Sequence, residues 1–142
     1  MNPGIDILLV EDDPRDVELT LRALKEHNLA NSIHVARDGA EALEYLFPQD
    51  ASRTPPPPKL VLLDLKLPKI DGLEVLCRIK DDPATKKLPV VILTSSKEAP
   101  DLEAAYEFGV NSYLCKPVEF QEFVNVVKQI GLYWLLLNEP PV

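Results

Sequence analysis

The chain has 142 residues, of which 46% are hydrophobic and 27% are charged, as expected for one globular domain that buries its own core. The formal net charge of −8 argues against a nucleic-acid or anionic-membrane ligand, because both favour positively charged proteins. Cys77 and Cys115 match no metal-ligand spacing, and no signal peptide or membrane-spanning apolar run is recognisable. We therefore expect a cytoplasmic protein with free thiols.

Apolar strand candidates alternate with helical patterns along the whole chain. In chain order the sequence predicts strand Ile5–Val10, helix Pro14–His27, strand Ser32–Ala36, helix Gly39–Phe47, strand Leu60–Asp64, helix Leu73–Lys80, strand Val90–Thr94, helix Pro100–Phe108, strand Ser112–Leu114 and helix Phe120–Leu137. Apolar residues run on along the predicted strands rather than alternating with polar ones, which indicates a sheet covered on both faces. Five strand–helix units in a row predict an α/β fold with a doubly wound parallel sheet.

Two segments depart from this regular alternation. The connection 48–59, PQDASRTPPPPK, is long, and its four consecutive prolines favour a stiff polyproline II surface loop. A docking segment for a proline-binding partner is the alternative, although no flanking recognition motif accompanies it. The end of the last helix, Leu132–Leu137, is apolar on every side, so we expect another chain to cover part of it. Packing against the domain's own surface is the other possibility.

Chemically capable side chains follow the predicted strands. In a doubly wound sheet, sites form at the carboxyl ends of the strands. These ends carry Glu11 and Asp12, then Asp64, Thr94 and Lys116. Carboxylates without His or Cys suit a hard cation such as Mg²⁺. Asp64 ends the most apolar strand, where a carboxylate needs a partner, and an ion pair with Lys116 is the alternative to a metal.

Asp13 has a different explanation from the two acids before it. It precedes Pro14, and proline is favoured at the first position of a helix, while aspartate is among the best N-caps. Asp16, in the first turn of the same helix, complements the helix dipole. We therefore assign Asp13 to helix capping and leave Glu11 and Asp12 for the site.

Taken together, these residues resemble a response-regulator receiver domain, the phosphoacceptor half of bacterial two-component signalling. The motifs are an acidic pair (Glu11 and Asp12), an aspartate in DLKLPKIDG (Asp64), a threonine in VVILTSS (Thr94) and a lysine in NSYLCKP (Lys116). Thr94 and Lys116 follow Asp64 by 30 and 52 residues, the spacings expected for this family. Each motif alone is weak, but together in this order they identify the family.

The resemblance covers nearly the whole chain and implies its organisation. We expect a flavodoxin-like sheet of strand order 2-1-3-4-5 with five helices. Residues 1–142 would form a single receiver domain, with 48–59 as a proline-rich loop insertion and 132–142 as a C-terminal extension.

The resemblance also implies roles for the site residues. Asp64 would accept a phosphoryl group from a phosphohistidine of a sensor histidine kinase, assisted by the charge of Lys116. The cation, Mg²⁺ or Mn²⁺, would be held by oxygen atoms of four residues: Glu11 (through water), Asp12, Asp64 and the main-chain carbonyl of Lys66. The hydroxyl of Thr94 and the ring of Tyr113 would form a switch pair. Such a protein is a signalling phosphoacceptor rather than an enzyme, and catalyses only its own phosphorylation and dephosphorylation.

The proline-rich segment, GVNSY and the YWL tail resemble the single-domain regulators paired with cyanobacterial and bacterial phytochromes. This implies a phytochrome-type kinase, a homodimer through the fourth and fifth helices and the tail, and output through a further protein. The alternatives are a haloacid-dehalogenase-type phosphohydrolase, a flavodoxin-like cofactor binder and a non-phosphorylated interaction module. Lys66 stands where the dehalogenases place a second acid, and EDDP would repel a cofactor phosphate.

Overall fold

The computed structural model describes residues 6–26, 32–53, 56–95, 98–116 and 119–129. The elements are β1 (Ile7–Val10), α1 (Pro14–Glu26), β2 (Ile33–Ala36), α2 (Gly39–Leu46), the 3-10 turn η1 (Ala51–Arg53), β3 (Leu60–Leu63), α3 (Gly72–Asp81), β4 (Val90–Thr94), α4 (Ala99–Glu107), β5 (Ser112–Cys115) and α5 (Phe120–Gln129). Within the described residues no helix has the length and apolar character that crossing a bilayer requires.

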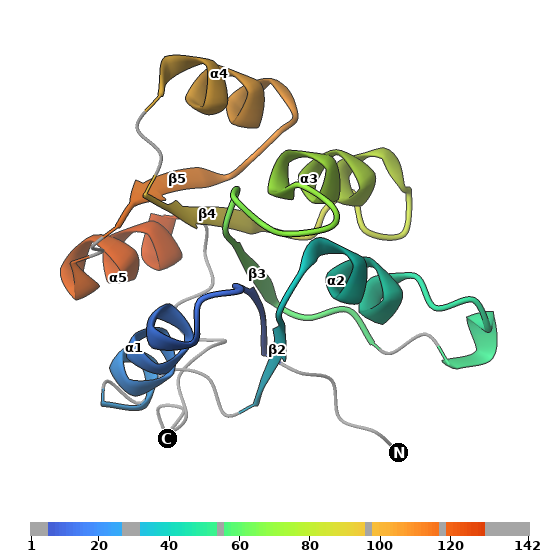
Figure 1. Ribbon diagram of the computed structural model, residues 1–142, viewed down its shortest axis with the longest axis horizontal. Coiled ribbons are helices and arrows are strands. Elements are labelled where there is room, and N and C mark those ends of the chain that lie inside the picture. The colour runs from blue at the N-terminus through green and yellow to red at the C-terminus, as the bar shows by residue number, and fades with distance from the viewer. Residues whose placement is uncertain (1–5, 27–31, 54–55, 96–97, 117–118, 130–142) are drawn as a thin grey trace.

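All five strands run parallel in one sheet of order β2-β1-β3-β4-β5, which confirms the predicted topology. Figure 1 shows α1 and α5 on one side of this sheet and α2 and α3 on the other. The register aligns the strand ends, because Val10 stands opposite both Ala36 and Leu63. The residues that follow β1 and β3 are therefore brought to the same edge of the sheet.

Successive strand residues enter two separate core clusters, because side chains alternate between the two faces of a strand. The cluster beneath α2, α3 and α4 takes from β1 and β3 the residues Leu8, Val10, Val61 and Leu63. The cluster beneath α1 and α5 takes the residues between them, which are Ile7, Leu9, Leu60 and Leu62. Both faces are apolar, so the strands read as continuous hydrophobic runs rather than as alternating ones.

The predicted elements all form, with shifts at their ends. β1 begins at Ile7, whereas its predicted start at Ile5 lies outside the described residues, and β3 ends at Leu63, one residue before Asp64. The predicted final helix is described as far as Gln129, so its continuation and the extension 132–142 lie outside the described residues. The sequence predicted a polyproline II stretch but no helical turn in the loop 48–59, yet the loop contains the 3-10 turn η1.

The turn η1 has a local cause. The Asp50 carboxylate accepts hydrogen bonds from the main-chain N of Ser52 at 3.0 Å and from its hydroxyl at 2.7 Å. An aspartate side chain that bonds the backbone two residues on mimics a turn. At the other end of the loop, Lys59 Nζ lies 2.9 Å from Asp6 Oδ1, which ties the loop to the start of β1.

Candidate functional site at the carboxyl edge of the sheet

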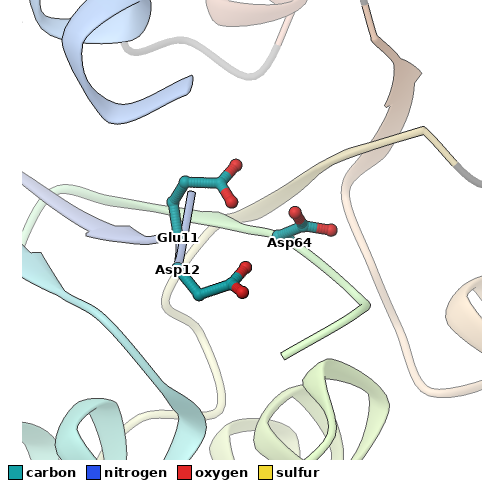
Figure 2. Close-up of side chains that lie close together, drawn as sticks. All are labelled: Glu11, Asp12 and Asp64. Carbon is teal, nitrogen blue, oxygen red and sulfur yellow. The ribbon is translucent and has the colours of Figure 1, made fainter. Parts of the chain in front are cut away.

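Glu11, Asp12 and Asp64 gather at the edge where β1 and β3 end. One carboxylate oxygen from each lies within 4.8 Å of the other two. Figure 2 shows Glu11 and Asp12 at the end of β1, with Asp64 facing them from the end of β3. The main-chain N of Asp64 donates to Val10 O at 3.0 Å, which fixes the two strand ends side by side. The structure thus brings together the three acids that the sequence placed in one site.

The three acids differ in their exposure to solvent. Glu11 and Asp64 are 3% and 8% exposed, whereas Asp12 is exposed. Every second residue of β1 and β3 faces α1 and α5, and Glu11 and Asp64 continue this alternation just beyond the strand ends. Asp12 comes one residue after Glu11 and therefore does not continue this alternation. Two of the acids therefore sit in a low-dielectric pocket, where their charge needs a partner.

Lys116 supplies the positive charge of this pocket. Its Nζ donates to Asp64 Oδ2 at 2.9 Å, to Asp16 Oδ2 at 2.8 Å and to Glu11 Oε1. The side chain of Lys116 is 17% exposed, and its main-chain N donates to Thr94 O at 2.8 Å, just after β5. An ion pair between Lys116 and Asp64, which the sequence offered as the alternative to a metal, is present within a larger group of carboxylates.

The surroundings shift the pKa values of the buried pair. Burial raises the pKa of Glu11 to about 7, and the nearby charge of Asp64 acts in the same direction, against the hydrogen bond from Lys116. Burial by itself lowers the pKa of Lys116, but the hydrogen bonds to its three carboxylates outweigh burial and raise that pKa. Lys116 is thus held as an ammonium, and Glu11 sits near its midpoint at neutral pH.

Asp13 caps α1, as the sequence predicted. Its carboxylate accepts a hydrogen bond from Arg15 N at 2.8 Å, and its main-chain O accepts one from Val17 N at 3.0 Å. The main-chain N of Asp13 donates to Glu11 Oε2 at 3.2 Å. The turn that carries the Asp13 cap therefore also orients the carboxylate of Glu11.

Asp16 belongs to the site, although the sequence predicted for it only a favourable interaction with the helix dipole. Its carboxylate is the third acceptor around Lys116. A sequence signal existed: Asp16, Thr20 and Leu24 recur at every fourth position of α1, and Leu24 is buried. An acid on the same helical stripe as a buried leucine is expected to face the sheet, and only the fold places Lys116 there.

The other predicted residues lie around this centre. Lys66 follows β3, and its main-chain N donates to Asp64 Oδ1 at 3.2 Å, while its Nζ pairs with Asp101 Oδ2 at 3.3 Å. Thr94 is fully buried at the end of β4. Tyr113 lies on the neighbouring strand β5, half-buried against the core cluster beneath α2, α3 and α4.

The donor set fits a hard divalent cation. All three clustered ligands are carboxylates, and oxygen ligands without His or Cys are those that Mg²⁺ and Mn²⁺ prefer. Glu11, Asp16 and Asp64 contact the ammonium of Lys116, and Asp12 lies beside Glu11 and Asp64, so the carboxyl groups of the pocket outnumber this ammonium. A cation with two positive charges would offset most of that excess.

Comparisons with known proteins agree with this geometry. The family model of the response regulator receiver domain matches residues 7–128. Response regulator Rcp1 of Synechocystis sp. is 42% identical over 134 residues, covering 94% of this chain and 91% of the relative. A solved structure of the Mn²⁺-bound form of response regulator Rcp1 has a TM-score of 0.76 and 40% identity, and the match covers 98% of this chain and 100% of that one.

Two further solved structures are similar over almost the whole chain. The bacteriophytochrome response regulator RtBRR has a TM-score of 0.82 and 50% identity, covering 98% of this chain and 85% of that one. The phosphorylated cyanobacterial phytochrome response regulator RcpA has a TM-score of 0.77 and 38% identity, covering 94% of this chain and 95% of that one. With the sheet order, the acidic cluster and the family match in place, the chain belongs to the response-regulator receiver family and acts as a phosphoacceptor in two-component signalling.

Proposed function

We propose that Asp64 of this receiver accepts the phosphoryl group, from a phosphohistidine of a phytochrome-type sensor histidine kinase. The observation that carries this assignment is the position of Asp64, a carboxylate 8% exposed at the end of β3 that shares Lys116 with Glu11. One Asp64 oxygen forms the new bond to phosphorus as the phosphorus–nitrogen bond of the donor breaks. The imidazole leaves with that bond's electron pair. Similarity to RtBRR and RcpA supports a phytochrome as the sensor.

The residues around Asp64 hold the charges that this transfer needs. Glu11, Asp12, Asp64 and the main-chain carbonyl of Lys66 would hold Mg²⁺ or Mn²⁺, with Glu11 acting through water. The bound cation would neutralise charge on the transferring phosphoryl group. Lys116 keeps its ammonium beside Asp64 Oδ2, where a phosphoryl oxygen would come to lie. The same site would later hydrolyse its own aspartyl phosphate.

The readout of phosphorylation would use Thr94 and Tyr113. Thr94 ends β4 and Tyr113 lies on the adjacent strand β5, so a hydroxyl drawn to the phosphoryl group leaves space that an aromatic ring can fill. Downstream, the signal would pass to a further protein in the cytoplasm, with no part played by nucleic acid or membrane. The dehalogenase alternative is not favoured, because the family match is to receivers.

A phosphorylation assay tests the assignment of Asp64. Incubation with acetyl phosphate and Mg²⁺ should add one phosphoryl group to the wild-type chain, measured by intact mass, and none to Asp64→Asn. Asp71→Asn is the matched control, because Asp71 follows in the same loop and caps α3 through Leu73 N, a role that Asn also fills. An equal mass gain in Asp64→Asn, or none in the wild type, would refute the proposal. Phosphotransfer from a panel of purified kinases would then identify the partner.

The chain would act as a homodimer through the α4 and α5 face and the extension 132–142. On α4 the side chains of Leu102 and Tyr106 are 39% and 52% exposed, and Ala105 is the residue that this helix buries. Such an apolar helix face is expected to be covered by a partner. Sedimentation of the 1–142 chain and of a form ending before Leu132 tests this proposal. It would be contradicted if both forms sedimented as monomers.

A further inference from the structure

Asp16 stands apart from the other carboxylates that surround Lys116. Glu11 and Asp64 both belong to the cluster able to hold a cation, whereas Asp16 does not. A lysine ammonium has three N–H donors, and the three carboxylates use all of them. The contact that Asp16 makes in the site is thus with Lys116 Nζ, at 2.8 Å.

The geometry shows that Asp16 does not draw Lys116 away from the reacting carboxylate. Lys116 Nζ lies 2.8 Å from Asp16 Oδ2 and, at the same time, 2.9 Å from Asp64 Oδ2. The ammonium is held between an oxygen of α1 and an oxygen at the end of β3. Both contacts are charge-assisted hydrogen bonds, which are shorter and stronger than neutral ones.

Phosphorylation of Asp64 would change the contacts of Lys116 with Asp64 and Glu11, whereas Asp16 takes no part in the transfer and could keep its contact. Once Asp64 carried the phosphoryl group, its oxygens would be part of an acyl phosphate, and Glu11 and Asp64 would also bind the cation. A lysine side chain has four flexible carbons and loses rotamer entropy when it is ordered. Without a fixed third partner, the ammonium would spread over several positions as these contacts change.

We propose that Asp16 is a positioning residue for phosphoryl transfer, which holds the ammonium of Lys116 where the phosphoryl oxygens arrive. This inference rests on the proposed phosphorylation of Asp64. In the step with acetyl phosphate, an Asp64 oxygen bonds to phosphorus and the bond from phosphorus to the acetate oxygen breaks. Acetate leaves with the electron pair of that bond. The ammonium of Lys116 keeps its protons and offers one N–H to the phosphoryl group while Asp16 retains another.

The test measures initial phosphorylation rates of Asp16→Asn at increasing acetyl phosphate with saturating Mg²⁺. We expect the maximal rate to fall by about tenfold, since small misplacements of a catalytic group are costly. The half-saturating donor concentration and the Mg²⁺ affinity, titrated by calorimetry without donor, should change by less than about threefold. Asp16→Glu should recover part of the rate. A cavity of about 580 Å³ between α1 and α5, lined by Asp16 and Lys116, has room for the longer side chain.

Glu18→Gln is the matched control for charge. It removes one negative charge from the same helix, but Glu18 pairs with Arg22 on the exposed face, at 2.8 Å. The double variant Asp16→Asn/Lys116→Ala should be no slower than Lys116→Ala alone. The inference is overturned if Asp16→Asn is as fast as Glu18→Gln, or if it slows the reaction equally without Lys116. A wild-type chain that gains no phosphoryl group refutes the proposed function itself, which is a distinguishable result.

Discussion

Asp12→Asn should stabilise the protein when no divalent cation is present. Asp12 is exposed, and its carboxylate lies within 4.8 Å of those of Glu11 and Asp64. Two unit charges at that separation repel by about 0.9 kcal/mol in bulk water and by about 3.5 kcal/mol at an effective dielectric constant of 20. Because Asp12 is exposed, the lower value applies to each pair. Two such pairs give a gain in the free energy of unfolding of about 1–2 kcal/mol, or a rise in Tm of roughly 3–6 °C.

The assay is urea unfolding at pH 8 in EDTA and again in Mg²⁺. At pH 8 the carboxyl of Glu11, whose pKa is about 7, is mostly ionised, so most of the repulsion is present. A cation at tenfold its dissociation constant should stabilise the wild type by about 1.4 kcal/mol and Asp12→Asn by much less. The difference between the two proteins should therefore shrink or reverse on addition of Mg²⁺.

Asp13→Asn is the control for this prediction. It removes the neighbouring charge, which lies outside the cluster, and Asn keeps the cap on α1. If Asp12→Asn is no more stable than Asp13→Asn in EDTA, the repulsion does not exist at the expected size. Asp13→Asn should gain as much stability from Mg²⁺ as the wild type does. If Asp12→Asn also gains that much, Asp12 does not contribute to cation binding, and the prediction is wrong.

Three further predictions concern the loops and helices that support the site. A Cβ on Gly72 would meet Asp64 O at 2.2 Å, so Gly72→Ala should lower the free energy of unfolding by about 1–3 kcal/mol, and unchanged urea unfolding would contradict this. The hydrogen bond from Glu41 N lowers the pKa of Asp38 in the folded protein. The ionised Asp38 should therefore stabilise the fold at any pH above the pKa that it has in the unfolded chain. This stabilisation should be lost as the pH falls through the lower pKa of the folded state. The difference in urea midpoint between wild type and Asp38→Ala should accordingly vanish below that pH and persist at pH 6. Thr85 is buried, and its hydroxyl donates to Ile79 O in α3 at 2.6 Å. Thr85→Val should therefore lower the free energy of unfolding by about 1 kcal/mol, measured by thermal unfolding. A variant more stable than the wild type would contradict this prediction.

Much of the fold could be predicted because its signals are local. Apolar runs marked β1, β3 and β4, and Asp13 before Pro14 marked the start of α1. The parallel sheet followed from the alternation of strands and helices, and the strand order from the resemblance to receivers. The turn η1 was missed because it depends on Asp50 bonding its own backbone, a contact that competes with any extended conformation of the loop.

The site was predicted only in part. The ends of β1 and β3 placed Glu11, Asp12 and Asp64 together, because aligned parallel strands bring their carboxyl ends to one edge. The part played by Asp16 could not be read from α1 alone, since its partner is a lysine 100 residues away along the chain. Nor did the sequence indicate that the ammonium of Lys66 pairs with Asp101 on α4.

The sequence by itself determined which groups are available and at which strand ends they stand. Strand periodicity and carboxyl-end position are properties of neighbouring residues, so the acids after β1 and β3 follow from them directly. The tertiary structure decided the electrostatics. The same side-chain chemistry gives a buried Glu11 with a pKa of about 7 and an exposed Asp12 one residue later. Burial and ion pairing depend on which helices cover the sheet edge, and no local pattern carries that information.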